Sequence, residues 1–305
     1  MRIDEAISEF LLEQKVRGNS EKTQIDYRQK LGQFRLFIGD VDVSEISVRR
    51  CKEWQLSLMD RDLQTASVQG YVRSARAFLH WLFLEDLIAE DLCTRFRVPK
   101  GQQKRIDVLT DQEIYSIYSV WPDPGSWVDA RNRVIVSLML DAGLRLSELV
   151  TAKRSNLHLR ERYLIVDGKG AKQRAVVFGI QTERMLGDYL RRAPKVDPLI
   201  ISSHFLNHPN APITGITGET VKDLFRVIRR RTGIRRLHPH LLRHTFATRY
   251  MENGGRERDL QDLLGHTSSK MTQRYVHMAQ RSVRREFVNF SPLDRLEDEK
   301  NPPTK

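Results

Sequence analysis

The chain has 305 residues, 40% of them hydrophobic and 8% aromatic, which is enough apolar material for two folded domains and argues against a disordered chain. No apolar run reaches the ~18 residues that a membrane span needs, and the opening "MRIDEAISEF" lacks the apolar core of a signal peptide. The formal net charge is +12, and the two cysteines lie outside any CxxC pattern, which excludes a disulfide framework and a cysteine-based zinc site and favours a cytoplasmic protein.

The positive charge is unevenly distributed along the chain. Residues 1–100 contain 16 Lys and Arg and 16 Asp and Glu, so the whole net charge of +12 lies in the remainder. A strongly basic region is typical of proteins that bind a polyanion, most often nucleic acid. The alternative is a solvated basic surface on a protein with some other task.

Hydrophobic residues recur every three or four positions through residues 1–97, which predicts four helices packed as one compact domain. The N-caps of the second, third and fourth helices are expected at Asn19-Ser20, Ser47 and Thr65. Four arginines on these helices either face DNA or belong to a plain solvated surface: Arg49, Arg50, Arg73 and Arg76.

A linker is expected after the first domain. Residues 98–105, "VPKGQQKR", contain a proline, a glycine and three basic residues, with no apolar side chain after Pro99. Thr110 and Glu113 then form the capping-box pattern that opens a helix. The sequence therefore predicts a second domain over 106–291, followed by a polar tail over 292–305.

The second domain mixes helices with a short hairpin, so the predicted fold class is mainly α with a small β-sheet. Gly143 ends the apolar helix "RNRVIVSLMLDAG", and Ser147 is placed as the N-cap of the next helix. Two β-rich runs around Asp167-Gly168 predict a hairpin. Four later segments are also predicted to be helical: "TGETVKDLFRVIRRRTG", "HLLRHTFATRYMENGG", "RDLQDLLGH" and "MTQRYVHMAQRSVRREFVNF".

Two basic residues of this domain stand in unusual places. Arg145 lies between two leucines at a helix junction, so its guanidinium either pairs with Glu148 or is held for bidentate phosphate binding. Lys169 lies at the hairpin tip between two glycines, which allow the loop to approach a ligand closely. A turn lysine that simply faces water fits Lys169 equally well.

Histidines and one tyrosine complete the set of candidate residues. His240 and Arg243 are three residues apart and share one helix face. Zinc is a weak alternative for the neighbouring histidines, because no acidic or cysteine ligand accompanies them, and no metal is predicted. His266 and Tyr275 lie in "GHTSSKMTQRYVHM", whose polarity argues against the usual role of a lone tyrosine as core filler. P-loop, nucleophile-elbow and zincin motifs are absent from the sequence, and no cofactor is predicted.

Together these six side chains have the chemistry to cleave a phosphodiester without a metal. Arginines stabilise charge on the equatorial oxygens of the transition state. A lysine can protonate the leaving 5′ oxygen, and a histidine can accept the tyrosine's proton. A tyrosine needs that help to act as a nucleophile, because its ordinary pKa is about 10.

The second domain resembles the catalytic domain of the tyrosine recombinases, also called the phage integrase family. The resemblance covers residues 106–280, and the order and spacing of the motifs both fit. The arrangement is most similar to the two-domain recombinases of the Xer type. The matching motifs are "AGLRLSEL" with Arg145, "GKGAKQR" with Lys169, "HLLR" with His240 and Arg243, "LLGH" with His266, and "TQRYVH" with Tyr275.

The resemblance implies a fold and a mechanism. The amino-terminal helices would be a SAM-like core-binding domain, and the second domain an α+β catalytic domain. Tyr275 would attack the scissile phosphate and form a 3′-phosphotyrosyl bond. Lys169 would act as general acid. The remaining candidates would hold the phosphate oxygens (Arg145 and Arg243) or transfer protons and donate hydrogen bonds in the transition state (His240 and His266), with no metal or cofactor.

The resemblance also implies partners: double-stranded DNA with a specific recombination site, and a homo- or hetero-tetramer that exchanges strands through a Holliday junction. The last helix, "RSVRREFVNF", would dock on a neighbouring protomer; packing within its own chain is the alternative. Integration, excision, dimer resolution and inversion are all compatible with this pattern. Two rival functions are a type IB topoisomerase and a catalytically inert DNA-binding regulator on the same fold.

Overall fold

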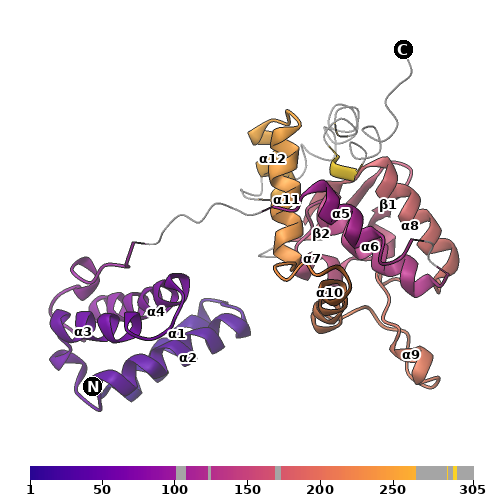
Figure 1. Cartoon of the computed structure of the whole chain (residues 1–305). Coiled ribbons are helices and arrows are strands. Elements are labelled where there is room, and N and C mark those ends of the chain that lie inside the picture. Colours follow the sequence, from indigo (N-terminus) through magenta and orange to yellow (C-terminus); the bar gives the residue numbers. More distant parts are fainter. Residues whose placement is uncertain (101–107, 123–124, 169–172, 266–286, 288–290, 294–305) are drawn as a thin grey trace. The chain divides into compact units, whose positions relative to one another are not determined.

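The computed structural model describes residues 1–100, 108–122, 125–168, 173–265, 287 and 291–293. The chain divides into two compact units, Met1–Arg105 and Ile106–Lys305 (Figure 1). Each unit has its own hydrophobic core. None of the helices in the described ranges is both long and apolar enough to cross a membrane.

The amino-terminal unit contains the four predicted helices. Ser20 caps α2 by accepting a hydrogen bond from the amide of Thr23, and Ser47 caps α3 in the same way. The prediction that Thr65 caps α4 is wrong: Gln64 is the N-cap, because its backbone is extended and its carbonyl accepts from the amide of Val68. The elements are α1 (Ile3–Val16), α2 (Glu21–Ile38), η1 (Val43–Glu45), α3 (Val48–Met59), α4 (Thr65–Leu84) and η2 (Leu92–Thr94).

Aromatic side chains fill the core between these helices. Phe10 of α1 packs edge-on against Phe78 of α4, with ring centroids 5.6 Å apart. Phe34 of α2 packs edge-on against Trp54 of α3 at 4.8 Å, and both rings are fully buried. Such edge-to-face pairs add about 0.5–1.5 kcal/mol each to the free energy of burial. The interactions explain why four helices of modest length form one compact unit.

The second unit is also mainly helical. The predicted capping box is confirmed, since Thr110 and Glu113 exchange hydrogen bonds at the start of α5. One long helix, α8, has no counterpart among the predicted elements, although Thr182, Leu186 and Tyr189 stand at helical spacing and are buried on one face. The helices are α5 (Asp111–Tyr118), α6 (Trp127–Asp141), α7 (Leu146–Thr151), η3 (Arg154–Asn156), α8 (Ile180–Arg192), α9 (His204–Asn207), α10 (Gly218–Thr232), α11 (Pro239–Glu252) and α12 (Glu257–Leu264).

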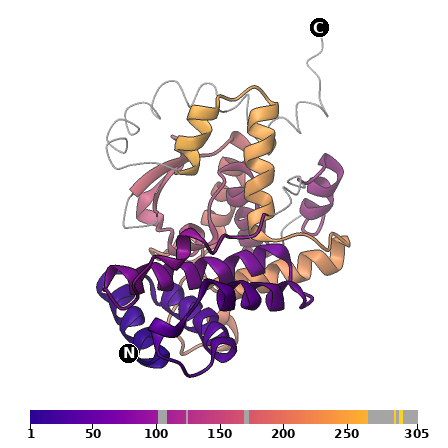
Figure 2. The ribbon, with the colours of Figure 1, turned by 90° about the vertical axis from the view of Figure 1, so that its left-hand side faces the viewer.

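Helix α6 is the centre of this unit. Every residue from Val134 to Asp141 is buried, as expected for a helix that is apolar on all sides. Helices α8 and α11 both pack against it. Helix α12 lies beside α11, and Figure 2 shows the two orange helices next to the sheet. The helix that is most deeply buried therefore supports the helix that carries His240 and Arg243.

The predicted hairpin is confirmed. Strands β1 (Leu157–His158), β2 (Tyr163–Asp167) and β3 (Gln173–Val177) form an antiparallel sheet in the order β1-β2-β3. Leu164 pairs with Val176, and both side chains are buried against the helices. The hairpin tip, with Lys169, lies outside the described residues.

The described carboxy-terminal residues pack on the second unit. Phe287 is 3% exposed, and its ring lies 6.5 Å from those of Phe246 and Tyr250. The Ser291 hydroxyl donates to the buried carboxylate of Asp141. Leu293 is buried in the main hydrophobic core of the second unit, two residues beyond the domain boundary that the sequence suggests. Phe287, which belongs to the segment expected to dock on a neighbouring protomer, thus packs within its own chain; the rest of that segment lies outside the described residues.

Gly143 is required where the chain turns from α6 toward α7. Its φ is +62°, and a Cβ there would lie 2.5 Å from Cδ1 of the Phe246 ring. Gly233, after α10, has a similar φ of +74° but no atom within 4 Å of an added Cβ. Substitution of Gly233 by alanine therefore tests the free-energy cost of the left-handed backbone alone, whereas substitution of Gly143 adds the cost of a collision with Phe246.

We expect Gly233→Ala to lower the free energy of unfolding by about 1 kcal/mol, the cost of a left-handed alanine. Gly143→Ala adds overpacking against Phe246 and should lose about 3 kcal/mol or more. Urea denaturation of the full chain measures both, because both glycines lie in the second unit. Equal losses for the two variants would contradict the collision with Phe246.

Candidate active site

Three of the six candidate residues lie in the described part of the chain. Arg145 is the N-cap of α7, and His240 and Arg243 lie in the first two turns of α11. Lys169, His266 and Tyr275 lie outside the described residues. The described part of the site therefore contains both candidate arginines and one of the two candidate histidines.

Glu148 fixes Arg145 in two ways. Its Oε2 accepts a hydrogen bond from the backbone amide of Arg145 at 2.8 Å, and its Oε1 accepts from Nη1 of the same residue at 2.8 Å. The prediction that Ser147 caps this helix is wrong, because the Glu148 carboxylate binds the Arg145 amide at the helix start and leaves Ser147 exposed inside the helix. Arg145 keeps 29% of its side chain exposed, so part of the guanidinium can reach a ligand.

A second arginine, Arg174 of β3, shares the same carboxylate. Its Nη2 lies 2.8 Å from Oε2 of Glu148, and its Nη1 donates to the backbone carbonyl of Leu263. Glu148 is only 1% exposed and Arg174 12%. Burial by itself raises the pKa of Glu148, but Arg174 and then Arg145 lower it, and the net pKa lies below the ordinary value for a glutamate.

Arg243 is held mainly by backbone carbonyls. Its Nη1 donates to the carbonyl of Gly143, and its Nη2 donates to that of Leu264 at 2.8 Å. Only 8% of the residue is exposed. Burial, reinforced by the nearby charges of Arg145 and Arg174, lowers its pKa to about 10, so it stays protonated at neutral pH. These two carbonyls tie α11 to the turn after α6 and to the end of α12.

We call Arg145, Arg174, Arg243 and Glu148 the arginine cluster. Arg145 and Arg174 bond to the carboxylate of Glu148, and Arg243 lies close enough to interact with its charge, so these residues carry two positive charges in excess. Arginine donors in a largely buried setting are well suited to an oxyanion, and a phosphate matches their fork geometry. The cluster therefore favours a phosphate group as its ligand.

His240 lies at the amino-terminal end of α11 and is exposed. Its neighbour His238 caps that helix, because its Nδ1 accepts from the amide of Leu241 at 3.1 Å. The rings of His238 and His240 lie 6.5 Å apart. Partial burial, together with the charges of His240, His244 and Arg229, lowers the pKa of His238. Since its Nδ1 serves the helix cap, His238 is a structural residue of the site.

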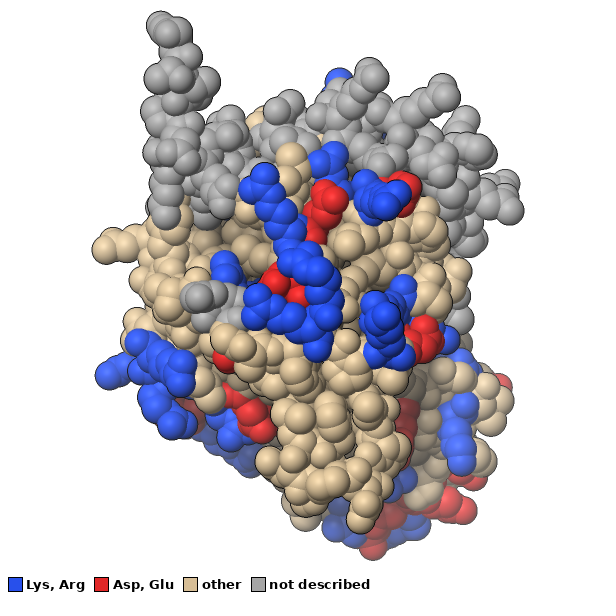
Figure 3. All heavy atoms as spheres, turned by 90° about the vertical axis from the view of Figure 1, so that its right-hand side faces the viewer, with Lys and Arg blue, Asp and Glu red and all other residues tan. Residues whose placement is uncertain are grey.

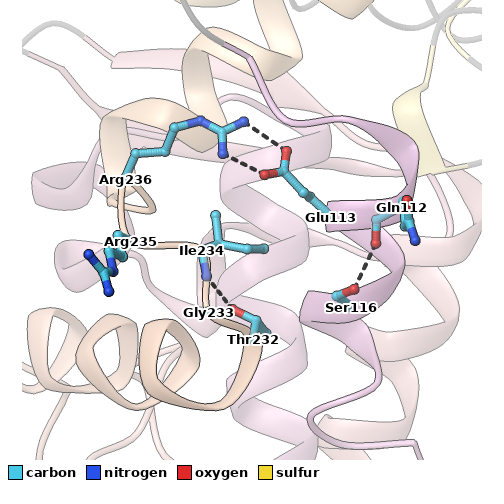
Figure 4. A pocket seen from close by; sticks show the side chains of 8 residues that line it. All are labelled: Gln112, Glu113, Ser116, Thr232, Gly233, Ile234, Arg235 and Arg236. Atoms are coloured by element: carbon cyan, nitrogen blue, oxygen red, sulfur yellow. Dashed lines mark hydrogen bonds and ion pairs between the residues drawn. The ribbon is translucent and has the colours of Figure 1, made fainter.

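Two further arginines fasten the start of the second unit to the segment that carries these residues. Arg236, just before α11, pairs with both carboxylate oxygens of Glu113 (Figure 4). Its Nη2 also donates to the carbonyl of Val108. Arg249 of α11 pairs with Asp111 at 2.6 Å. The first described residues after the linker are thus bound directly to α11 and to the segment just before it.

Basic side chains in the amino-terminal unit also donate hydrogen bonds within their own unit. Arg76 donates to the carbonyl of Phe96 at 2.7 Å, and Arg50 to that of Phe37 at 3.2 Å. Across the molecule, basic groups often lie beside acidic ones, as Figure 3 shows on one face. An open hollow in this unit, lined in part by Lys52, Arg95 and Arg97, is more uniformly basic.

Sequence reasoning missed Arg174. Glu148 was considered only as an ion-pair partner of Arg145, and that pair is present. A carboxylate in an apolar helical segment requires cationic partners, and this requirement was the available signal. The partner lies 26 positions away on a strand, so only the fold identifies it.

Comparison with known proteins places these residues in a family. Residues 107–281 match the sequence profile of the phage integrase family. The tyrosine recombinase XerC of Bacillus pumilus is 30% identical over 257 residues, covering 81% of this chain and 82% of that protein. XerC of Listeria innocua serovar 6a is 28% identical over 90% of this chain and 93% of that protein. A lambda integrase tetramer bound to a Holliday junction has the same fold, with a TM-score of 0.69 at 19% identity over 88% of this chain and 79% of that one.

The buried charge of Glu148 should make stability depend on pH. Its folded-state pKa is depressed, so the stabilisation is complete above its unfolded pKa of about 4.3 and is lost as the pH falls through the folded pKa. We expect Glu148→Gln to cost about 3 kcal/mol at pH 7. The difference in unfolding free energy from the wild type should then shrink below about pH 4.

Urea denaturation at pH 7, 5, 4 and 3.5 measures this difference. Glu161→Gln, at an exposed position between β1 and β2, is the matched control and should change little at any pH. A difference for Glu148→Gln that stays constant down to pH 3.5 would show that the carboxylate is not held ionised by the arginines.

Proposed function

Because the chain belongs to the phage integrase family, we propose that it is a site-specific DNA recombinase. It breaks and rejoins DNA strands through a 3′-phosphotyrosyl intermediate and a Holliday junction. The observation that carries the proposal is the arginine cluster, in which Arg145 and Arg174 bond to the buried carboxylate of Glu148 and Arg243 is held nearby by backbone carbonyls, with positive charge in excess. Such a site attracts a phosphodiester and has the donors to stabilise its transition state.

Six residues carry the reaction in this proposal. The Tyr275 oxygen attacks the scissile phosphorus while the bond to the 5′ oxygen breaks. His240 and His266 accept the tyrosine's proton and donate hydrogen bonds to the phosphate, and Lys169 protonates the leaving 5′ oxygen. The 5′-hydroxyl of another strand then attacks the phosphotyrosyl bond in the reverse sense. No metal or nucleotide cofactor enters, because the covalent bond conserves the energy of the broken linkage.

The described geometry supports the roles of the two arginines. Arg145 is partly exposed yet fixed by Glu148, so it can contact a phosphate oxygen with little loss of side-chain entropy. Arg243 is held by two carbonyls that carry only partial charge, so its full positive charge is available to an anion. Preorganised donors of this kind need not reorganise as charge develops in the transition state.

The domain organisation follows from the same proposal. Residues 1–97 form a core-binding domain, 98–105 a basic linker and 106–291 the catalytic domain. The buried Leu293 extends this domain into the segment 292–305 that was expected to be a polar tail. The partner is double-stranded DNA with a specific site, bound in the cytoplasm. Assembly as a homo- or hetero-tetramer is supported by the lambda integrase tetramer, whose structure contains a Holliday junction. Docking on a neighbour is proposed for the carboxy-terminal segment apart from Phe287, which packs within its own chain.

A covalent-capture experiment tests the proposal. The protein is mixed with randomly nicked duplex DNA in EDTA, denatured in SDS, and the attached DNA is sequenced. A nick near the scissile bond lets the 5′-hydroxyl fragment leave, so the intermediate accumulates. We expect attached DNA with one shared motif for the wild type and none for Tyr275→Phe. Arg145→Ala and Arg243→Ala should each slow attachment about 10²–10³-fold with much smaller losses in binding.

Other outcomes identify the rival functions. Attached DNA without a shared motif would favour a type IB topoisomerase. Retained DNA binding with no attached DNA, also after addition of host extract to supply a partner, would favour an inert regulator. Covalent attachment by Tyr275→Phe would exclude Tyr275 as the nucleophile.

A further inference from the structure

We propose that Arg174 is a positioning residue of the active site, acting through Glu148 on Arg145 and holding the end of α12 in place. The inference rests on the proposed recombinase function. Arg174 is the second residue of β3 and pairs with Val166 across the hairpin. It is therefore rooted in the hairpin whose tip holds Lys169.

The contacts of Arg174 join three separate segments. Its Nη2 and Nε point to the two oxygens of Glu148, at 2.8 and 3.4 Å. Its Nη1 donates to the carbonyl of Leu263 in the last turn of α12. Thus one guanidinium links β3, α7 and α12. With Nε and both Nη atoms engaged inside the protein, Arg174 is better placed to brace the site than to bind the phosphate itself.

Arg174 controls the orientation of Arg145 through a shared carboxylate. Glu148 directs one oxygen to the Nη1 of Arg145 and the other to its backbone amide. Both oxygens are also bonded by Arg174, which keeps the carboxylate from rotating. Without Arg174, the nearly buried carboxylate loses its second cation, and its hold on Arg145 is less well defined. The expected consequence is a misplaced phosphate donor.

The second contact fixes the point at which the chain leaves α12. Arg174 holds the carbonyl of Leu263, and Arg243 holds that of the next residue, Leu264. Gly265 then turns the chain with a φ of +67°, and a Cβ there would lie 2.7 Å from Cδ of Arg174. Two arginines thus bond to successive carbonyls in the last turn of α12, just before Gly265. The position of this helix end therefore depends on both.

Charge and geometry can be separated by substitution. Arg174→Lys keeps the positive charge but loses the planar fork that reaches two oxygens and a carbonyl together. Arg174→Met removes the charge and retains much of the buried stem. If position matters most, the lysine variant should recover only a minor part of the lost rate.

The test measures single-turnover covalent attachment of the full-length protein to a nicked duplex that the wild type captures. Protein is in excess and saturating, and DNA affinity is measured separately by gel shift. We expect Arg174→Met to slow attachment at least 100-fold while affinity changes less than fivefold, and Arg174→Lys to recover less than tenfold. Arg174→Met and Glu148→Gln should be non-additive, with the double variant about as slow as the slower single variant.

Arg249→Met is the matched control, because Arg249 also bonds a carboxylate and a backbone carbonyl, those of Asp111 and Leu109, in the same unit. It should lower the melting temperature but leave the attachment rate within threefold. The inference is overturned if Arg174→Met attaches as fast as the wild type. It is also overturned if the two Met variants slow attachment equally, or if the effects of Arg174→Met and Glu148→Gln on the rate are additive. A wild type that attaches no DNA overturns the proposed function, and the inference falls with it.

Discussion

Glu148 is the residue on which the described half of the site depends. A carboxylate that is 1% exposed is costly to bury, and in this chain Arg145 and Arg174 offset that cost. The same pairing places the two arginines side by side, although their positions in the sequence are 29 apart. Because the carboxylate can neutralise only one of them, the site retains positive charge. A structural requirement, the pairing of one buried charge, thus creates a site that selects an anion.

Fold stability and active-site geometry use the same contacts in this protein. Arg243 bonds to the carbonyl of Gly143, whose positive φ brings the turn after α6 against the ring of Phe246. Phe246 lies on α11, one turn after Arg243, and is fully buried. Packing of α11 on α6 therefore positions Arg243 at the same time as it builds the core. Residues with no catalytic task, such as Gly143 and Phe246, consequently constrain the site as tightly as its charged groups do.

Much of the fold was predictable from local patterns. The capping box at Thr110, the N-caps Ser20 and Ser47, and the hairpin around Asp167 were each read correctly, because short-range hydrogen bonds determine them. The predictions for Ser147 and Thr65 were wrong because a neighbouring residue supplied the cap instead. Helix α8 was missed although Thr182, Leu186 and Tyr189 repeat at helical spacing, so the sequence did contain the pattern that predicts it.

In the candidate site too, residues within local motifs were predictable and long-range contacts were not. The motifs pointed to Arg145, His240 and Arg243 as individual residues, and the structure places the two arginines near the same carboxylate. Arg174 could not be found in this way, since its partners are 26 and 89 positions distant and none of them forms a sequence pattern with it. Long-range polar contacts depend on how the elements pack, and local periodicity carries no information about that.

The excess positive charge of the arginine cluster favours the binding of an anion. Burial and mutual repulsion among the arginines lower the pKa of Arg243 to about 10, which means that its charged form is destabilised in the folded protein. A phosphate between Arg145 and Arg243 would relieve that repulsion, and a ligand that binds only the folded state also stabilises it. The repulsion stored in the free protein is thereby released on binding the phosphodiester. Because charge on the phosphate increases toward the transition state, the relief is greatest there, and it lowers the barrier to cleavage.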